Sequence, residues 1–457
     1  MHDASFGDVR KQRAITIGIK IRFTSILYKR YNVIGKFIYR GHYVNEALKK
    51  CLRLGQVPAV GNVETGAIVG LSGSGAALCD AMAAHDVPEE DVPADCVELV
   101  AYMRQHGFIE DGAGEGAVHL GRARLRSAYL HVTNRCNLSC VGCYSRDEGR
   151  NRDEDPTFDQ LAHAVDVLAE LGVEQLIVSG GEPFLREDLA ELAAHAKQGG
   201  IATVIILTNG MLCTDERIAP LAGKVDTISV SFDGPPSQSP SYIRGKQLFD
   251  RLVEVIKRIK GAGIQAHILP TIHAKNIDDV PAYLELGKQL GATVGFSLLS
   301  GLTGTLGDLA PSDDDFVRLA EVMQAAGATA GVDSVFLDGA QPTLQACACC
   351  GAGKTGVSVA ADGSVYPCHM LRYAPFLLGS AFEDSADTLR DSLARFALPT
   401  VDELDGCKDC NKRYLCGGGC RARAYMEYGR ADCRDPYCAY NKRSIEDAVS
   451  FVLAAMA

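Results

Sequence analysis

The sequence predicts an α/β protein in which an open barrel of alternating strands and helices is followed by a cysteine-rich domain. Between residues 122 and 312, six short Val/Ile-rich segments alternate with amphipathic stretches, which is the pattern of βαβ units and a parallel sheet. The chain holds 17 cysteines, and ten of them lie between residues 347 and 438. A shorter strand-and-helix pattern at residues 55–110 predicts a small N-terminal α+β domain.

The six alternating units predict a partial (β/α)6 barrel, an open version of the eight-unit TIM barrel. The expected strands are residues 128–133, 175–179, 203–208, 227–232, 266–271 and 293–298. The expected helices are residues 158–171, 187–198, 214–221, 249–262 and 278–290. In such barrels the reactive residues lie at the C-terminal ends of the strands.

Outside the barrel core, residues 122–312, the chain divides into shorter segments. These are a basic extension at 1–54, the small domain at 55–110, a Gly-rich linker at 111–121, a helical bridge at 313–339, the Cys-rich domain at 340–445 and a C-terminal tail at 446–457. We expect little regular structure in the Cys-rich domain, because its short elements are interrupted by many glycines and cysteines.

Charge is unevenly distributed along the chain. The formal net charge is -11, but residues 1–55 hold twelve Lys/Arg against three acidic residues, a local balance of +9. This basic extension is compatible with a tail that contacts nucleic acid or an acidic peptide, with a transit peptide, or with an upstream extension of the reading frame. No apolar run reaches the ~20 residues needed to span a bilayer, and no secretory signal is recognisable. We therefore expect a cytoplasmic protein without a membrane span, and no nucleic-acid partner for its folded domains.

The first group of chemical interest is Cys136, Cys140 and Cys143, directly after the first barrel strand. Three thiolates at this spacing on one loop can hold three irons of a [4Fe–4S] cluster and leave the fourth iron open to a cofactor or substrate. A structural zinc site would usually have four protein ligands, and no fourth Cys or His follows nearby. The loop therefore predicts an iron–sulfur centre.

With these residues the sequence resembles the radical S-adenosylmethionine (SAM) superfamily over about residues 120–310. The resemblance rests on motifs that occur in the expected order: Cys136, Cys140 and Cys143 with Tyr144, then Gly180-Gly181-Glu182-Pro183, Thr208-Asn209-Gly210, Ser231-Phe232-Asp233-Gly234 and Arg244-Gly245. The three motifs between Gly180 and Gly234 come at the ends of the second, third and fourth predicted strands.

The resemblance implies a SAM site at these motifs. Gly180, Gly181, Glu182 and Pro183 match the segment that binds the SAM amino group, where exposed carbonyls and a carboxylate can receive an ammonium. Asn209 matches a further cofactor-binding position. Ser231 is implied as a ribose or methionine contact, and Arg244 as a partner of the SAM carboxylate, because its planar fork suits that group. For Ser231 and Arg244 a purely structural role is the alternative.

The second group of cysteines is C-terminal and resembles the SPASM extension of radical SAM enzymes. Its pattern is Cys350, Gly363, Cys368, a C-x2-C-x5-C-x3-C run at Cys407, Cys410, Cys416 and Cys420, and finally Cys438. The resemblance implies two auxiliary [4Fe–4S] clusters, one on Cys407, Cys410, Cys416 and Cys438, the other on Cys350, Cys368, Cys420 and either Cys347 or Cys349. Cys433 would be a spare thiol. Two structural zinc sites are the rival interpretation.

The small domain at residues 55–110 resembles the winged-helix-like peptide-recognition element that is related to the pyrroloquinoline-quinone peptide chaperone. Its pattern is Glu64-Thr65-Gly66-Ala67-Ile68-Val69-Gly70-Leu71, then Gly75-Ala76-Ala77-Leu78. Such a fold offers a sheet edge to which a leader peptide can add as a strand. A generic winged-helix module is the alternative.

Together these resemblances imply a radical SAM/SPASM maturase with three [4Fe–4S] clusters. It would modify a ribosomally made precursor peptide that carries a leader, forming a crosslink or an oxidised residue, with flavodoxin or ferredoxin as reductant. A sulfatase-maturing enzyme is less favoured, because His369 stands where such enzymes usually carry an acidic base. A tetrapyrrole-modifying enzyme and a non-catalytic zinc-ribbon interaction protein remain alternatives. The sequence does not identify a catalytic acid or base.

Overall fold

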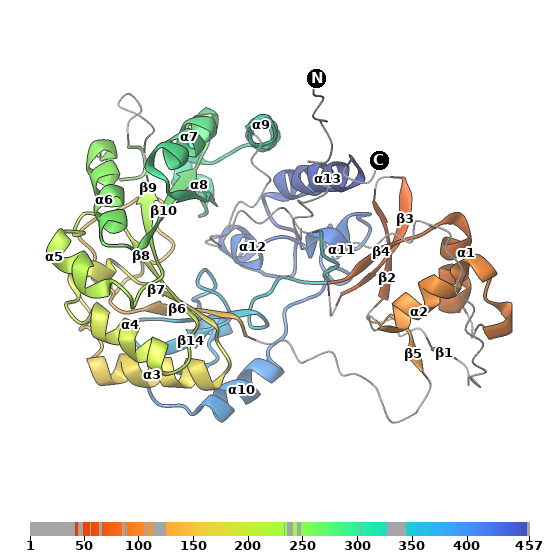
Figure 1. Ribbon diagram of the computed structural model, residues 1–457, viewed down its shortest axis with the longest axis horizontal. Helices are drawn as coiled ribbons and strands as arrows, with labels where there is room; N and C mark the ends of the chain where they lie inside the picture. The colour runs from red at the N-terminus through yellow and green to blue at the C-terminus, as the bar shows by residue number, and fades with distance from the viewer. Residues whose placement is uncertain are drawn as a thin grey trace, which may run out of the picture.

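The computed structural model places three parts side by side: the barrel, the Cys-rich domain and the small N-terminal domain (Figure 1). It describes residues 42–43, 49–54, 56–63, 66–84, 87, 89–105, 108–111, 125–232, 234, 241–244, 248–301, 303–326 and 344–454. Most of the basic extension and of the linker lies outside these residues, as do Glu64, Thr65, Asp233 and Gly245 of the motifs. Among the described residues, no helix is long and apolar enough to cross a membrane.

A parallel sheet forms the barrel, with its strands in chain order from one edge to the other. The strands are β6 (Ser127–His131), β7 (Gln175–Ser179), β8 (Thr203–Thr208), β9 (Thr227–Phe232) and β10 (Gln265–Ile272). The sixth predicted strand is in fact two, β11 (Thr293–Val294) and β12 (Ser297–Leu298), both parallel to β10. Gly295 lies between them, and a glycine commonly marks such a break because it has no side chain to pack.

Five helices alternate with these strands and cover the outer face of the sheet (Figure 1). They are α3 (Phe158–Glu170), α4 (Leu189–Gln198), α5 (Asp215–Ile218), α6 (Phe249–Gly261) and α7 (Val280–Leu290). A capping box starts α3: the Thr157 side chain accepts from the Gln160 backbone N–H, and the Gln160 side chain accepts from the Thr157 N–H.

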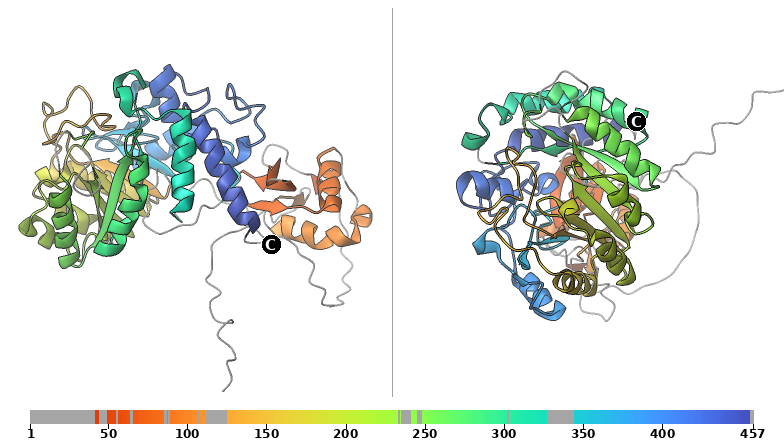
Figure 2. Two further views of the ribbon diagram at one scale, coloured as in Figure 1. Left: turned by 90° about the horizontal axis from the view of Figure 1, so that it is seen from above. Right: turned by 90° about the vertical axis from the view of Figure 1, so that its left-hand side faces the viewer.

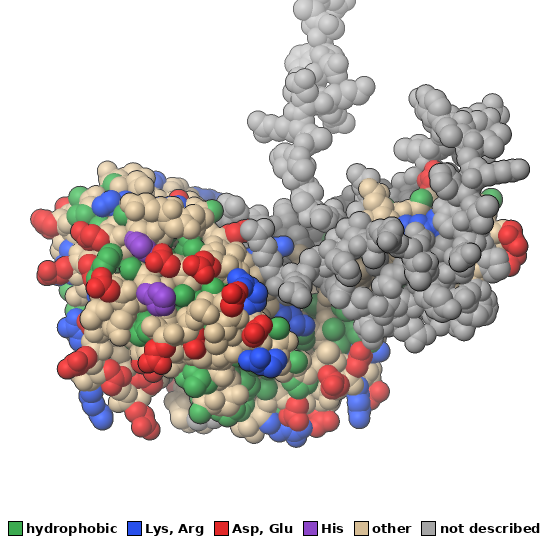
Figure 3. Space-filling model, turned by 90° about the horizontal axis from the view of Figure 1, so that it is seen from below, with side chains coloured by type: hydrophobic (Ala, Val, Ile, Leu, Met, Phe, Trp, Pro, Cys, Tyr) green, Lys and Arg blue, Asp and Glu red, His purple; other side chains and the backbone are tan. Residues whose placement is uncertain are grey.

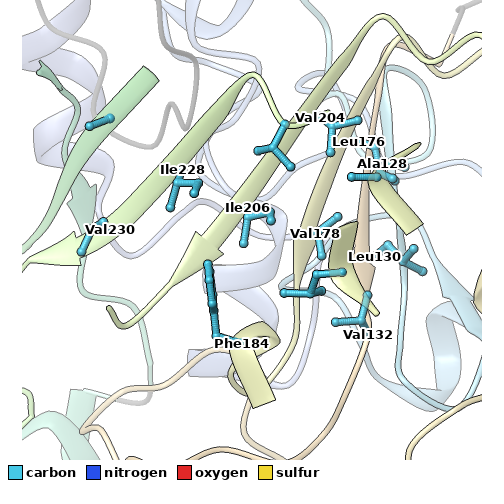
Figure 4. Close-up of a cluster of buried hydrophobic side chains, with 14 of the residues drawn as sticks. Ala128, Leu130, Val132, Leu176, Val178, Phe184, Val204, Ile206, Ile228 and Val230 are labelled. Carbon is cyan, nitrogen blue, oxygen red and sulfur yellow. The ribbon is translucent and has the colours of Figure 1, made fainter. Parts of the chain in front are cut away.

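The core lies between the sheet and these helices. Figure 4 shows Leu130, Val178, Ile206 and Val230 from neighbouring strands on the same side of the sheet. Because successive side chains of a strand point to opposite faces, the residues between them face the concave side of the barrel. The apolar face is therefore used for stability, and the other face is available for chemistry.

The Cys-rich domain contains more regular structure than the sequence predicts. Its strand β13 (Gly356–Val359) pairs parallel to β6, and β14 (Ser364–Tyr366) and β15 (Gly379–Ser380) continue the same sheet in antiparallel order. The expectation of little regular structure here was wrong. β13 is short, but it pairs with β6, a strand that is remote in sequence, and becomes mostly buried in that sheet. The domain thereby closes the β6 edge of the barrel.

The predicted C-terminal tail is also wrong. Residues up to 454 continue α13 (Cys438–Ala454), which starts within the Cys-rich domain. Ala448, Val449 and Val452 on this helix are buried, and their helical spacing explains why the segment folds instead of trailing off. Figure 2 shows α13 lying beside α9 (Asp313–Ala325), the helix of the predicted bridge.

The Cys-rich domain also has α10 (Ala386–Arg395), α11 (Arg413–Cys416) and α12 (Arg421–Tyr428).

Acidic side chains are spread over the barrel face that is seen in Figure 3, in line with the negative net charge of the chain beyond its basic extension.

The N-terminal domain begins earlier than predicted. Its antiparallel sheet consists of β2 (Lys49–Leu54), β3 (Val57–Asn62) and β4 (Ile68–Gly70), so residues 49–54 belong to it and not to the basic extension. Helices α1 (Gly73–Ala84) and α2 (Val97–Gln105) cover one face. The apolar alternation of Leu52 and Leu54 explains the extra strand, since both are buried against the Cys-rich domain. A two-residue pair, β1 (His42–Tyr43) with β5 (Glu110–Asp111), lies at its border.

Candidate active site and cluster sites

The loop after β6 brings Cys136, Cys140 and Cys143 to one cavity of about 230 Å³. Its other lining residues are mostly charged or polar: Leu138, Ser139, Arg146, Asp147, Glu148, Arg150, Asn151 and Arg152. Three thiols converging at the C-terminal end of a barrel strand form the donor set that the sequence predicts for an iron–sulfur cluster.

Hydrogen bonds from the following segment hold this loop in shape. The Cys136 N–H donates to Asn151 Oδ1 at 2.7 Å, and Asn134 Nδ2 donates to Asp147 at 2.7 Å and to Asp153 at 2.8 Å. Burial raises the pKa of the Cys136 thiol, while the Arg150 guanidinium acts in the opposite direction. Ligation by iron would take the thiolate and release the proton.

Gly180 and Gly181 allow the loop after β7 to lie directly against this cysteine loop. The Gly181 N–H donates to Thr133 O at 2.8 Å. Gly180 has φ +136°, and a Cβ there would lie 2.4 Å from Thr133 O. A Cβ on Gly181 would lie 1.9 Å from Arg135 O. Only glycine fits both positions, so this close approach depends on the absence of side chains.

Glu182 is fully buried and joins the ends of β7 and β8. Its carboxylate accepts from the Phe184 N–H at 3.0 Å, from Thr208 Oγ1 at 2.7 Å and from the Asn209 N–H at 2.8 Å. Burial raises its pKa, and these donors together with the nearby Arg244 guanidinium oppose that rise. Pro183 begins the short 3₁₀ helix Pro183–Leu185 that follows.

Asn209 connects β8 to the cysteine loop. Its Nδ2 donates to Asn137 Oδ1 at 2.7 Å and lies 4.0 Å from Cys136 Sγ. Ser231 alternates with the core residues Val230 and Phe232 on β9, and so faces the concave side. Among the described residues, the structure thus brings the cysteine loop, the Gly180-Gly181 turn, Glu182 and Asn209 together at the C-terminal ends of the strands.

Tyr144 and His369 stand out in the sequence, but the sequence does not predict that they lie together with Tyr129 at this site. Tyr144 OH lies 2.8 Å from Ser179 Oγ, and its ring meets the ring of His369 edge-on at 5.1 Å. His369 in turn stacks on Tyr129 of β6 at 4.1 Å. The available signal was the alternation of Tyr129 and His131 with apolar residues on the first strand, which places both on the concave face.

The C-terminal cysteines fall into two groups. Cys407, Cys410, Cys416 and Cys438 line one cavity, formed by the loop before α11, the end of α11 and the start of α13. These are the four cysteines that the resemblance implies for one auxiliary cluster.

The other group surrounds a small apolar cluster. Cys350, Cys368 and Cys420 all pack against Leu371, Leu398 and Ala422. Cys347 and Cys349 are the two candidates for the fourth position. The Cys347 Sγ would lie 2.9 Å from a Cβ added to Gly417. The Cys349 Sγ accepts from Lys354 Nζ at 3.0 Å. Burial raises the pKa of both Cys347 and Cys368 to about 12. None of the cysteines that the structure describes is in a disulfide.

Three buried charged residues between the two groups were also missed. Asp435 accepts from the Cys420 N–H at 2.7 Å and from Arg423 Nη2 at 2.8 Å. Arg421 is almost fully buried and donates to Gly418 O and Cys433 O. Burial raises the pKa of Cys407 and of Cys350, and the Arg421 charge opposes that rise. Their position between cysteines was the signal that could have found them. Residue type alone would place them at the surface, because a charged residue is seldom fully buried unless it is paired.

Comparison with known proteins identifies the family. Residues 130–287 match the radical SAM superfamily, and residues 349–411 match the iron–sulfur cluster-binding domain SPASM. The PqqA peptide cyclase of Ruegeria pomeroyi is 32% identical, over 67% of this chain and 85% of that protein. This chain belongs to the radical SAM superfamily. It is therefore an enzyme that uses SAM and a [4Fe–4S] cluster, and its SPASM domain binds auxiliary clusters, which rules out the zinc-ribbon alternative.

Two other proteins are similar over most of the chain. The AdoMet-dependent heme synthase of Methanosarcina barkeri is 29% identical, over 68% of this chain and 95% of that protein. The crystal structure of Streptococcus suis SuiB bound to precursor peptide SuiA superposes with a TM-score of 0.53 at 16% identity, covering 87% of this chain and 99% of SuiB. At this identity the SuiB match shows a shared fold.

Proposed function

We propose that this enzyme abstracts a hydrogen atom from a ribosomally made precursor peptide, which it binds through the leader. The observation that carries the proposal is the convergence of Cys136, Cys140 and Cys143 on one cavity beside the Gly180-Gly181 turn. The bound cluster and SAM supply the chemistry, a 5′-deoxyadenosyl radical that can attack an unactivated carbon.

We assign the roles of the chain's own residues in the SAM site from the resemblance of their motifs. The three thiolates would hold the cluster to which SAM binds. Gly180 and Gly181 let their turn lie directly against the cysteine loop, and the backbone of this turn would receive the SAM amino group, with Glu182 and Pro183 fixing the turn. Asn209, Ser231 and Arg244 complete the set: Ser231 contacts the ribose or methionine part, and Arg244 pairs with the carboxylate of SAM.

The SPASM cysteines are assigned to two auxiliary clusters. One uses Cys407, Cys410, Cys416 and Cys438. The other uses Cys350, Cys368 and Cys420 with Cys347 or Cys349. The buried Arg421 supports both assignments, because its positive charge opposes the rise in pKa that burial causes at Cys350 and Cys407. Together with the SAM site this makes three clusters.

A peptide substrate is supported by the N-terminal domain. Its strand β4 is at the edge of the sheet, and among the described residues no strand pairs with its outer side. A leader peptide can add there as a further strand. The 32% identity to a PqqA peptide cyclase points in the same direction. We also propose a cytoplasmic location and a flavodoxin or ferredoxin as reductant.

A tetrapyrrole is the second candidate substrate, since the heme synthase of Methanosarcina barkeri is 29% identical. Formylglycine formation is disfavoured, because the residue after Cys368 is His369 instead of an acidic residue.

The test is anaerobic. Iron and sulfide are measured per chain, and 5′-deoxyadenosine formation from SAM is followed under a strong reductant, for the wild type and for Cys136→Ala/Cys140→Ala/Cys143→Ala. We expect about twelve irons and deoxyadenosine for the wild type, and loss of cleavage for the triple variant. Retained cleavage would refute the assignment of the SAM cluster. Peptides encoded by short reading frames beside the gene, and a porphyrin, are then compared as ligands; tight binding of the porphyrin alone would favour the second candidate.

A further inference from the structure

A short segment of the SPASM domain, residues 368–372, lies against the loop that carries the predicted SAM cluster. The sheet brings this part of the chain next to the barrel: β13 pairs parallel to β6, and β14, which lies near β6 in Figure 1, pairs antiparallel to β13 and so runs towards the N-terminal end of β6. The segment leaves β14 two residues after Tyr366 and immediately includes the cluster ligand Cys368. After β14 the segment turns back, and its side chains contact the residues that follow Cys143 on the cysteine loop.

Ring contacts form the first part of this interface. The His369 imidazole stacks on Tyr129 of β6, with ring centroids 4.1 Å apart and planes 24° apart. The same imidazole meets the Tyr144 ring at 5.1 Å and 84°, an edge-to-face arrangement. Such offset and edge-on geometries are the favoured ones for aromatic pairs. His369 is thus wedged between the strand and the residue directly after Cys143.

Arg372 forms the second part. Its Nη2 donates to the backbone oxygen of Tyr144 at 3.4 Å, and its Nη1 lies 3.9 Å from Asp147 Oδ2. The Arg372 side chain is 12% exposed, so solvent screens these contacts only weakly. The guanidinium therefore joins the SPASM segment to the cysteine loop on both sides of Ser145 and Arg146.

Tyr144 connects these residues to the predicted SAM site. Its hydroxyl lies 2.8 Å from Ser179 Oγ, and Ser179 directly precedes Gly180. Its ring also meets His131 of β6 edge-on at 6.1 Å. One aromatic side chain thus contacts the first strand, the Gly180-Gly181 turn and the SPASM segment.

We propose that His369 and Arg372 are positioning residues: they hold Tyr144, and through it the Cys143 end of the cysteine loop, in the geometry that SAM binding requires. We assign the role of His369 to the packing of its ring; its Nδ1 also lies 3.9 Å from Cys368 Sγ, a contact that His369→Phe removes. The proposal rests on the assignment of Cys136, Cys140 and Cys143 to the SAM cluster. It makes the SPASM domain part of the SAM site, in addition to its own clusters.

The test compares full-length, anaerobically reconstituted variants. His369→Ala removes the ring, His369→Phe keeps a ring without nitrogens, and Arg372→Ala removes the guanidinium. Tyr373→Ala is the matched control, because Tyr373 directly follows this segment but packs on Tyr425. The readouts are amide hydrogen exchange of residues 140–152 and the electron paramagnetic resonance signal of the reduced cluster on addition of SAM.

We expect His369→Ala and Arg372→Ala to raise exchange in residues 140–152 severalfold and to weaken the SAM-dependent change of the signal. His369→Phe should restore both, and Tyr373→Ala should match the wild type. Unchanged exchange in His369→Ala overturns the proposal. So does a His369→Phe variant as impaired as His369→Ala, which would mean that the imidazole nitrogens act. If the wild type forms no deoxyadenosine, the proposed function fails, whereas the exchange result still decides the positioning role.

Discussion

The backbone N–H of Ala346 donates a hydrogen bond of 3.0 Å to the carbonyl oxygen of Gly66. This bond attaches the N-terminal domain to the segment that immediately precedes Cys347. The two domains also share a hydrophobic cluster, in which Leu54 and Ile68 of the N-terminal sheet meet Val449 of α13. The domain proposed to bind the leader is therefore packed onto the domain that carries the auxiliary cysteines.

Gly61→Ala should disturb this junction. A Cβ at Gly61 would lie 2.6 Å from Ala346 Cβ and 2.8 Å from Leu52 Cδ2, so the sheet and the Ala346 segment must move apart. We expect a loss of about 1–3 kcal/mol in the free energy of unfolding, as for other overpacked cores, and a lower iron content. Denaturant unfolding and iron analysis measure both. Gly73→Ala is the control, because nothing lies within 4 Å of its added methyl; equal effects of the two changes would contradict the junction.

Gly181→Ala should impair the SAM site with little effect on auxiliary iron. The new Cβ would lie 1.9 Å from Arg135 O, a backbone atom that cannot rotate away. We expect deoxyadenosine formation to fall at least tenfold, measured by chromatography after anaerobic incubation with SAM, because the turn must withdraw from the cysteine loop. Gly199→Ala is the matched control, since Gly199 has φ -71° and only ordinary contacts. Normal turnover by Gly181→Ala would show that the close approach is dispensable.

Cys410→Ala should remove one auxiliary cluster and spare the other two. We expect iron to fall by about four per chain while reductive cleavage of SAM continues, because Cys410 lines the cavity shared with Cys407, Cys416 and Cys438. Iron, sulfide and deoxyadenosine are measured on the same sample. Cys433→Ala provides the comparison, since the Cys433 thiol is not part of that cavity. Unchanged iron in Cys410→Ala would remove it from the ligand set.

Asp435→Asn should destabilise the SPASM domain strongly. The Asp435 and Arg423 side chains are 1% and 5% exposed, and removing the carboxylate charge leaves the guanidinium buried without its counter-ion. Breaking a buried pair in this way costs about 3–5 kcal/mol. Asp432→Asn removes a carboxylate that is 53% exposed, and such surface pairs contribute at most about 1 kcal/mol. Thermal unfolding of both variants tests the contrast, which similar melting temperatures would disprove.

The barrel should lose stability as the pH falls below about 6.5. Burial lowers the pKa of His267 to about 4 and that of His273 to about 4, so between these values and 6.5 the unfolded chain binds protons that the folded chain does not. Asp279, whose pKa is raised to about 6, acts in the opposite direction. His267→Gln should therefore reduce the pH dependence by up to about 1.4 kcal/mol per pH unit. Urea unfolding at neutral and mildly acidic pH measures this pH dependence of the free energy of unfolding. If the dependence is the same in His267→Gln as in the wild type, His267 does not contribute to it.

Much of the fold could be predicted from local pattern. The periodicity of β7, β8 and α6 is strong because each has a core face and an outer face, and their observed bounds differ from the predicted ones by a residue at most. The cysteine loop, the Gly180-Gly181 turn and Asn209 could likewise be placed together, because the C-terminal ends of parallel strands meet at one edge.

The remainder depends on contacts between segments that are far apart in the chain. β13 is four residues long and becomes a strand only because β6, more than two hundred residues earlier, offers it an edge. Residues 49–54 form a short segment, and residues 446–454 are terminal. The apolar side chains of both segments become buried only when the segments pack against the Cys-rich domain.

The sequence by itself determined the chemistry: which cysteines are available, in which spacing, and that they belong to a radical SAM core with a SPASM extension. Only the tertiary structure decided which side chains surround them. His369, Arg372 and Tyr144 come together across 228 residues of chain, as the hydrogen bond between Arg372 and Tyr144 shows. Local propensity reports the conformation of each segment, whereas contacts of this kind form when the β6 edge of the barrel and the SPASM domain bury their surfaces against each other.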